Sequence, residues 1–196
     1  MTAAQQLFPP ATLTAVSRWR NPLLLWGGFV VVHLWLGFLN LFGPGYPLND
    51  VTSVYKYWID GGIVAHFWVG IDGPWVYPVG AIIPMLLAHL SYPIAAAIAG
   101  FPAVELGAGL YGGSWLALVM LLNAIALGVI TGWGRRFDRL AAGWWWVAFL
   151  TLLGPIALGR IDSITVPLAL VGVSLIATRP RAAAVLLTAA AWVKVW

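Results

Sequence analysis

The stretch of the chain from Asn21 to Asn49 carries no acidic or basic charge, and it is followed directly by Asp50. A helix that crosses the apolar core of a bilayer needs about 20 predominantly apolar residues. The stretch is long enough, so it predicts a membrane-spanning helix. Asp50 is one of only six acidic residues, and its position predicts a carboxylate at the membrane surface. An ordinary loop or helix-capping aspartate is the alternative interpretation.

The composition predicts several such helices. The chain is 62% hydrophobic and 8% charged, with a mean hydropathy of +0.92, whereas soluble domains carry about 25% charged residues. We therefore expect an all-α polytopic membrane bundle in which residues 1–196 form one domain. The chain has no cysteine, which excludes disulfides and thiolate metal sites. The net charge of +4 does not indicate a nucleic-acid partner, because the arginines lie in short gaps between apolar runs.

The placement of the arginines predicts the topology. The apolar runs are Pro22–Phe42, Trp75–Val104, Leu106–Gly134, Leu140–Gly159, Ser163–Thr178 and Ala182–Val193. Cytoplasmic loops are enriched in Lys and Arg. If the segment from Trp75 to Leu90 does not cross the membrane, seven of the eight arginines share the cytoplasmic face. The opposite face then carries Asp50, Asp60, Asp72, Arg160 and Asp162.

Prolines support this reading of the segment from Trp75 to Leu90. Pro78, Pro84 and Pro93 lie in or next to it, and each removes a backbone donor and disfavours a straight helix. We predict an interfacial or re-entrant helix within an extracytoplasmic loop of about residues 43–105. The protein is then a multi-pass protein of the cell membrane with a cytoplasmic amino terminus and membrane lipids as neighbours.

The extracytoplasmic loop contains the first candidate site residues. A helix beginning around Asn49 puts Asp50 and Tyr57–Trp58 near one face, and Asn49 or Asp50 can cap it. A carboxylate here can take a proton from an acceptor that arrives from the aqueous side. Asp72 lies between glycines, next to Trp75 and Tyr77. Ordinary turn chemistry is the alternative for Asp72.

A second group of candidates follows the fourth run. Arg160 and Asp162 lie in a short connection between apolar runs, and Lys194 directly follows the last run, far along the helix from its start at Ala182. Charged residues at membrane depth are costly, are usually paired and mark functional sites. A lysine there can hold a phosphate as a point charge. The alternatives are a short exposed loop and a lysine that extends to the interface.

Other kinds of site have no support in the sequence. The histidines, His33, His66 and His89, show no metal-ligand spacing. There is no phosphate-binding glycine loop, dinucleotide fingerprint or nucleophile elbow. We therefore expect no cofactor, no metal and no soluble nucleotide substrate.

Several short motifs resemble the GT-C membrane glycosyltransferases. Asp50 followed by Tyr55 and Trp58, and then Trp75-Val76-Tyr77-Pro78, is similar to their first outer loop. Gly159–Ser163 and the segment Ala190–Trp196 with its lysine follow in the same order. The nearest resemblance is to glycosyltransferase family 87, the polyprenyl-phosphate-mannose-dependent mannosyltransferases, over Leu23 to Trp196. Members of that family have more spans, so the resemblance implies the amino-terminal part of a longer enzyme.

The resemblance implies an inverting transfer of a sugar, mannose in that family, from a polyprenyl-phosphate donor to a lipid or glycan acceptor. It implies that Asp50 is the general base and that Arg160 and Lys194 stabilise the departing phosphate. Tyr55, Trp58, Asp72, Tyr77 and Asp162 are then candidates for substrate binding. The competing interpretation is a non-catalytic membrane protein, such as a small transporter or an assembly subunit. Transporters usually place their charges near the membrane midplane, whereas here the acids lie toward one aqueous face.

Overall fold

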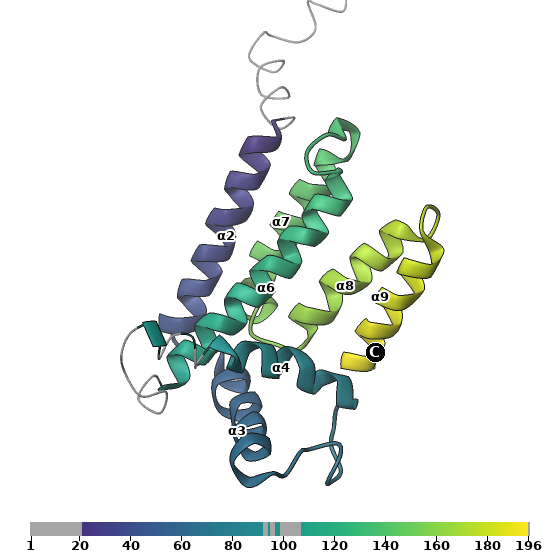
Figure 1. Ribbon diagram of the computed structural model, residues 1–196. Coiled ribbons are helices and arrows are strands. Elements are labelled where there is room, and N and C mark those ends of the chain that lie inside the picture. Colours follow the sequence, from purple (N-terminus) through teal and green to yellow (C-terminus); the bar gives the residue numbers. More distant parts are fainter. Residues whose placement is uncertain (1–20, 92–93, 95–96, 99–106, 196) are drawn as a thin grey trace, which may run out of the picture.

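The computed structural model describes residues 21–91, 94, 97–98 and 107–195, and within them the chain is an all-α bundle (Figure 1). The longer helices are α2 (Pro22–Phe42), α6 (Gly107–Thr131), α7 (Leu140–Leu153), α8 (Asp162–Leu175) and α9 (Pro180–Val193). The shorter elements are the π-helical η2 (Asp50–Tyr55), α3 (Lys56–Ala65), η3 (Val79–Ala81), α4 (Ile82–His89), η5 (Phe137–Arg139) and η6 (Gly154–Ala157).

Three helical segments are long and apolar enough to cross a membrane, which confirms the predicted helical membrane bundle. They are Pro22–Phe42, Gly109–Thr131 and Phe137–Ala157. Helices α8 and α9 are apolar but shorter, with 14 residues each, and they pack against each other as an antiparallel pair. The run predicted as Ser163–Thr178 is therefore helical from Asp162 to Leu175 and shorter than a usual span.

The segment predicted to be interfacial has a short helix in the structure. Its helical part, η3 with α4, runs only from Val79 to His89, or about 17 Å of helix, which is far less than the thickness of a bilayer core. The helix lies across one end of the bundle, against α3 and α6 (Figure 1). The described part of the segment from Trp75 to Leu90 therefore contains no membrane-crossing helix.

The main core lies where α6 meets the short helices at this end. Trp115 and Tyr111 of α6 are fully buried. The Trp115 Nε1–H donates to the Leu158 carbonyl oxygen at 3.0 Å, and the Tyr111 hydroxyl donates to the Met85 carbonyl oxygen at 2.9 Å. Both aromatic side chains thus bury a large apolar surface while their polar atoms stay paired. These contacts join α6 to α4 and to the connection between α7 and α8.

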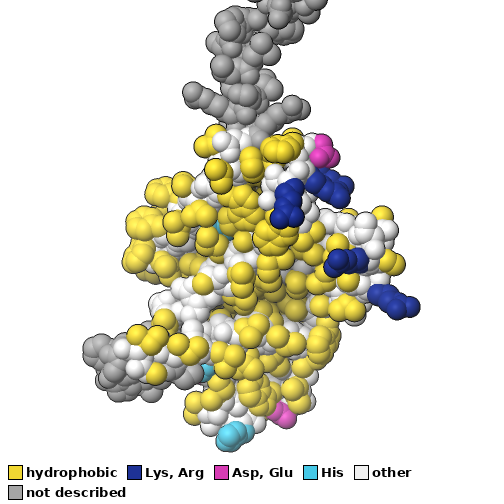
Figure 2. Space-filling model, turned by 45° about the horizontal axis from the view of Figure 1, so that its top comes forward, with side chains coloured by type: hydrophobic (Ala, Val, Ile, Leu, Met, Phe, Trp, Pro, Cys, Tyr) yellow, Lys and Arg dark blue, Asp and Glu magenta, His cyan; other side chains and the backbone are white. Residues whose placement is uncertain are grey.

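Charged side chains separate to the two ends of the bundle. The α6–α7 connection carries Arg135, Arg136 and Arg139, and the α8–α9 connection carries Arg179 and Arg181. Figure 1 shows both connections at the end opposite to α3 and α4. In Figure 2 the basic side chains gather toward one end, and hydrophobic surface covers the face below them. The predicted partition is present among the described residues, and Arg18 and Arg20 lie outside them.

Candidate functional site

Asp50 and Arg160 form an ion pair although they are far apart in the sequence. Asp50 is the first residue of η2, and its Oδ2 contacts Nη1 of Arg160, in the connection between η6 and α8. Both side chains are half-buried. Asp50 and Arg160 were predicted from the sequence as separate candidates, and the structure brings the two side chains into contact.

The packing of the segments that precede Asp50 and Arg160 explains why this pair forms. Asn40, at the end of α2, donates through Nδ2 to the Pro155 carbonyl oxygen at 2.9 Å, which joins α2 to η6. Gly159 then comes very close to the turn before Asp50, since a Cβ on it would lie 2.8 Å from the Pro47 carbonyl oxygen. Only glycine fits such a close backbone approach. The close backbone approach at Gly159 therefore places Arg160 beside Asp50.

A second ion pair joins Asp162 to Lys194. Lys194 Nζ lies 2.8 Å from Oδ1 and 2.6 Å from Oδ2 of Asp162. Asp162 begins α8 and Lys194 directly follows α9, so the antiparallel packing of the two helices brings them together. The amino end of α8 also favours a carboxylate electrostatically. A close approach at Gly80 supports the end of α9, because a Cβ there would lie 2.6 Å from the Trp192 carbonyl oxygen.

Tyr55 holds the backbone between the two charged pairs. Its hydroxyl oxygen accepts a hydrogen bond from the Ile161 backbone N–H at 3.2 Å, and Ile161 stands between Arg160 and Asp162. The side chain is 1% exposed. Burial, followed by the nearby Tyr77, raises the pKa of the Tyr55 hydroxyl well above its usual range, so the phenol stays neutral at physiological pH. Tyr55 was predicted to bind substrate. In the structure its side chain is enclosed by protein, and it positions the connection that carries Arg160 and Asp162.

The other predicted aromatic residues pack around Tyr55. Trp58 stacks on Tyr55 with ring centroids 5.8 Å apart, and it meets Trp75 edge to face at 5.2 Å. Tyr77 completes the cluster, 5.6 Å from Trp75. Trp75 and Tyr77 thus pack the segment that follows α3 against η2 and α3. Trp58 and Tyr77 are partly buried, so each keeps some surface for a ligand.

Asp72 lies in a turn and stabilises it, as the alternative interpretation of ordinary turn chemistry predicts. Its Oδ2 accepts a hydrogen bond from the Trp68 backbone N–H at 2.7 Å, and the Gly70 N–H donates to the Gly73 carbonyl oxygen at 2.9 Å. The side chain therefore stabilises its own loop. Among the described contacts, none joins Asp72 to the Asp50–Arg160 pair.

Of the two residues predicted as possible helix caps, Asn49 and Asp50, Asn49 is not a cap. The Asn49 side chain makes no capping hydrogen bond to the helix; its Oδ1 instead accepts from the Ser53 hydroxyl at 3.0 Å. The chain enters a π-helical turn at Asp50 rather than an α-helix, which rotates the following residues. Tyr57, expected on the face of Asp50, is 74% exposed.

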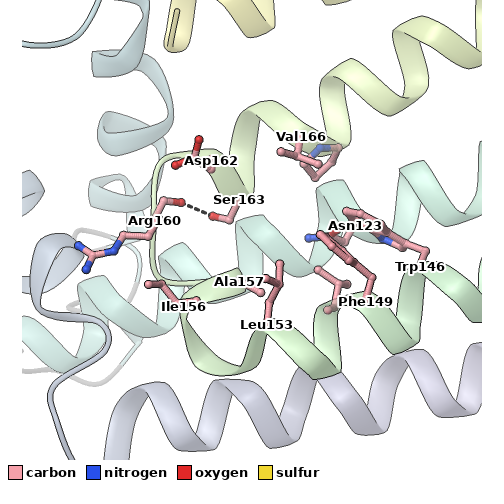
Figure 3. Close-up of a pocket in the computed structure, with 12 residues that line it drawn as sticks. Asn123, Trp146, Phe149, Leu153, Ile156, Ala157, Arg160, Asp162, Ser163 and Val166 are labelled. Atoms are coloured by element: carbon pink, nitrogen blue, oxygen red, sulfur yellow. Dashed lines mark hydrogen bonds between the residues drawn. The ribbon is translucent and has the colours of Figure 1, made fainter. Parts of the chain in front are cut away.

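An apolar pocket opens beside the two ion pairs. Its volume is about 240 Å³. Figure 3 shows Arg160 and Asp162 toward one end of the drawn residues and Asn123 and Trp146 toward the other. Its lining comes from α6, α7, η6 and α8: Asn123, Trp146, Phe149, Leu150, Leu153, Ile156, Ala157, Arg160, Asp162, Ser163, Val166 and Pro167. Asp50 does not line the pocket but contacts it through Arg160.

Asn123 and Trp146 were not among the residues predicted from the sequence. Both are at least nine-tenths buried in the bundle. Asn123 is a polar residue within an apolar helix, and such residues mark functional positions in membrane proteins. That signal was present in the sequence. Nothing in the sequence distinguishes Trp146 from Trp144 and Trp145 beside it.

A separate polar cluster joins α3 to α4. Lys56 Nζ lies 2.5 Å from Asp60 Oδ2, and His89 Nε2 lies 3.6 Å from Asp60 Oδ1. Burial lowers the pKa of His89, and the nearby Asp60 partly offsets this effect. Within the described residues, no three His, Cys, Asp or Glu side chains gather as metal ligands. His33, His66 and His89 do not meet one another in any described contact.

Comparison of the chain with family models, with curated proteins and with solved structures found no match in any of the three. The fold and the candidate site define the class: a helical membrane protein with paired charges at one end of its bundle. Any more specific function must be argued from the site itself.

Proposed function

We propose that this protein is an inverting membrane glycosyltransferase. It moves a sugar, mannose by resemblance, from a polyprenyl-phosphate donor to a lipid or glycan acceptor. The observation that carries this proposal is the arrangement of Asp50–Arg160 and Asp162–Lys194 beside an apolar pocket. Four candidates named from separate parts of the sequence form two contacts at one end of the bundle. This supports a reaction at the membrane surface.

The chemistry requires a base on one side of the sugar and a leaving phosphate on the other. The acceptor hydroxyl oxygen forms a bond to the anomeric carbon while the bond from that carbon to the phosphate oxygen breaks, and the lipid phosphate keeps the electron pair. Asp50 takes the proton of the acceptor. Its ion pair uses Oδ2, so Oδ1 is the oxygen that accepts this proton.

Arg160 and Lys194 supply the positive charge for the leaving group. An arginine carries five N–H donors and a lysine three. Lys194 directs two hydrogen bonds to Asp162, which leaves one donor for a phosphate oxygen. Arg160 belongs to the pocket lining, and its guanidinium, which points away from the other lining residues in Figure 3, contacts Asp50. The same guanidinium can therefore orient the base and stabilise the developing phosphate charge.

The proposed orientation follows from the charge partition. The arginine-bearing connections face the cytoplasm, in agreement with the positive-inside rule. The amino terminus is then cytoplasmic, and Asp50, Asp162 and Lys194 lie at the extracytoplasmic surface of the cell membrane. Donor lipid reaches the pocket laterally through the bilayer, and the acceptor approaches the exposed side.

A transfer assay tests this function. Membranes that contain the protein, expressed from its native gene, receive labelled polyprenyl phosphomannose, and transfer of label to endogenous acceptor is measured. Asp50→Asn should lower the rate by about 10²–10⁴-fold, because that is the usual contribution of a general base. Asp72→Asn is the control, since Asp72 stabilises its own turn. Full activity in Asp50→Asn, with activity lost in Asp72→Asn, would contradict the assignment of the base.

A further inference from the structure

Two buried polar atoms in the pocket have no hydrogen-bond partner within the described residues. They are the Oδ1 of Asn123 and the Nε1 of Trp146. The Asn123 side chain is 1% exposed and the Trp146 side chain 7%, and both residues line the pocket. Buried polar groups in proteins are nearly always paired, so this pair indicates a missing partner.

The two atoms are complementary in type. Asn123 Nδ2 donates to the Val119 carbonyl oxygen at 3.0 Å, which orients the amide and leaves Oδ1 as a hydrogen-bond acceptor. The indole Nε1–H of Trp146 is only a donor. Figure 3 shows both side chains at the same end of the pocket, so one group that both donates and accepts can serve both atoms. A hydroxyl is the smallest organic group that does so.

The surroundings of these atoms are apolar and lie deep in the bundle. Trp115 of α6 lies beside the α7–α8 connection, because its side chain bonds to Leu158. Asn123 lies about 12 Å farther along α6, at 1.5 Å per residue, and is therefore far from this end of the bundle. Between the two ends the pocket is lined by apolar side chains, which include Phe149, Leu153 and Ile156. An alkyl chain fits this lining, and a free sugar or nucleotide does not.

We propose that the pocket binds a lipid whose chain carries a hydroxyl group well below its head group. The hydroxyl donates to Asn123 Oδ1 and accepts from Trp146 Nε1–H, while an anionic head group lies at Arg160. The inference goes beyond the proposed function, because a polyprenyl chain carries no hydroxyl and this lipid is therefore a ligand other than the sugar donor. A plain hydrocarbon chain would leave both polar atoms unpaired, and a carbonyl would pair only with Trp146.

Direct binding of two matched probes tests the inference. Tritiated stearate and mid-chain hydroxystearate are titrated against the purified protein, expressed from its native gene, in nanodiscs. Wild type should bind hydroxystearate about 5- to 10-fold more tightly, because each hydrogen bond in such a site contributes modestly. Asn123→Leu should lose this preference while it binds stearate at least as well as wild type, which also shows that the variant is folded. Trp146→Phe should reduce the preference.

The control is Ser174→Ala, which removes an exposed hydroxyl of α8 outside the pocket and should keep the preference. Equal affinities of wild type for the two probes, as expected if a single water occupies the polar pair, would overturn the inference. So would a preference that survives in Asn123→Leu. The measurement does not use catalysis. A hydroxyl preference without sugar transfer would refute the proposed function alone, and transfer without the preference would refute this inference alone.

Discussion

The hydroxyl oxygen of Tyr55 accepts a hydrogen bond from the backbone N–H of Ile161 at 3.2 Å. This bond joins η2, which begins with Asp50, to the connection that carries Arg160 and Asp162. Tyr55 therefore fixes the distance between the base and the positive charges of the candidate site. Its role is positioning, because the ring is buried against Trp58 and Trp115.

Tyr55→Phe should destabilise the protein by about 1–2 kcal/mol, because it leaves the buried Ile161 N–H without a partner and keeps the ring. Thermal unfolding in detergent measures the effect as a lower Tm. Tyr57→Phe, in α3 directly after η2, is the matched control, since Tyr57 is 74% exposed, and it should leave Tm unchanged. The positioning role predicts a lower kcat for transfer as well. Equal Tm values for wild type and Tyr55→Phe would show that the bond does not hold the connection.

The raised pKa of Tyr55 gives a pH dependence at the alkaline end. The folded state holds the phenolic proton more tightly than the unfolded state, whose tyrosine pKa is about 10. Its contribution to stability is therefore complete below that pH and is lost as the pH rises above it. Wild type should lose Tm above about pH 10 more steeply than Tyr55→Phe. Parallel curves for the two proteins would contradict the assigned burial effect.

Lys194→Gln should weaken donor binding more than it weakens the fold. Half-exposed ion pairs contribute about 0–1 kcal/mol to stability, so Tm should change little. The KM for the polyprenyl-phosphate donor should rise, since a phosphate-binding charge is lost. Lys56→Gln, which removes the lysine paired with Asp60 on α3, is the control and should leave KM unchanged. An unchanged donor KM in Lys194→Gln would remove Lys194 from the site.

The topology can be tested directly because the chain has no cysteine. Val64→Cys on α3 and Asp138→Cys in the α6–α7 connection introduce single thiols at exposed positions. A membrane-impermeant maleimide added to intact cells should label the first and not the second. The opposite pattern would place the arginine-bearing connections outside and would reverse the proposed orientation.

Much of the fold was predictable from the sequence because a bilayer imposes a minimum length on each apolar run. Pro22–Phe42 matches its predicted run, and the charged segments at Arg135 and Arg179 mark real helix connections. Prolines correctly indicated that the segment from Trp75 to Leu90 is not a span. Helix ends were less predictable, since α8 stops at Leu175, before the next charge.

The site was predictable in its members but not in its contacts. Charged residues such as Arg160, Asp162 and Lys194 stand out because charge is rare in this chain. The sequence does not show which acidic residue pairs with which basic residue. The Asp50–Arg160 pairing depends on a close approach at Gly159 and on a π-helical turn, and both are tertiary features. Trp146 joins the pocket because of the rotation of α7 against α6, which the sequence pattern does not determine.

The most direct test of the account is the rate of sugar transfer by Asp50→Asn, measured beside its Tm. The account predicts a loss of about 10²–10⁴-fold in transfer, with Tm changed by only the small amount expected for a half-exposed ion pair. Arg160→Lys is an informative companion, because it keeps the charge but not the planar guanidinium. Wild-type transfer by Asp50→Asn in a folded protein would contradict the central claim that this carboxylate is the base.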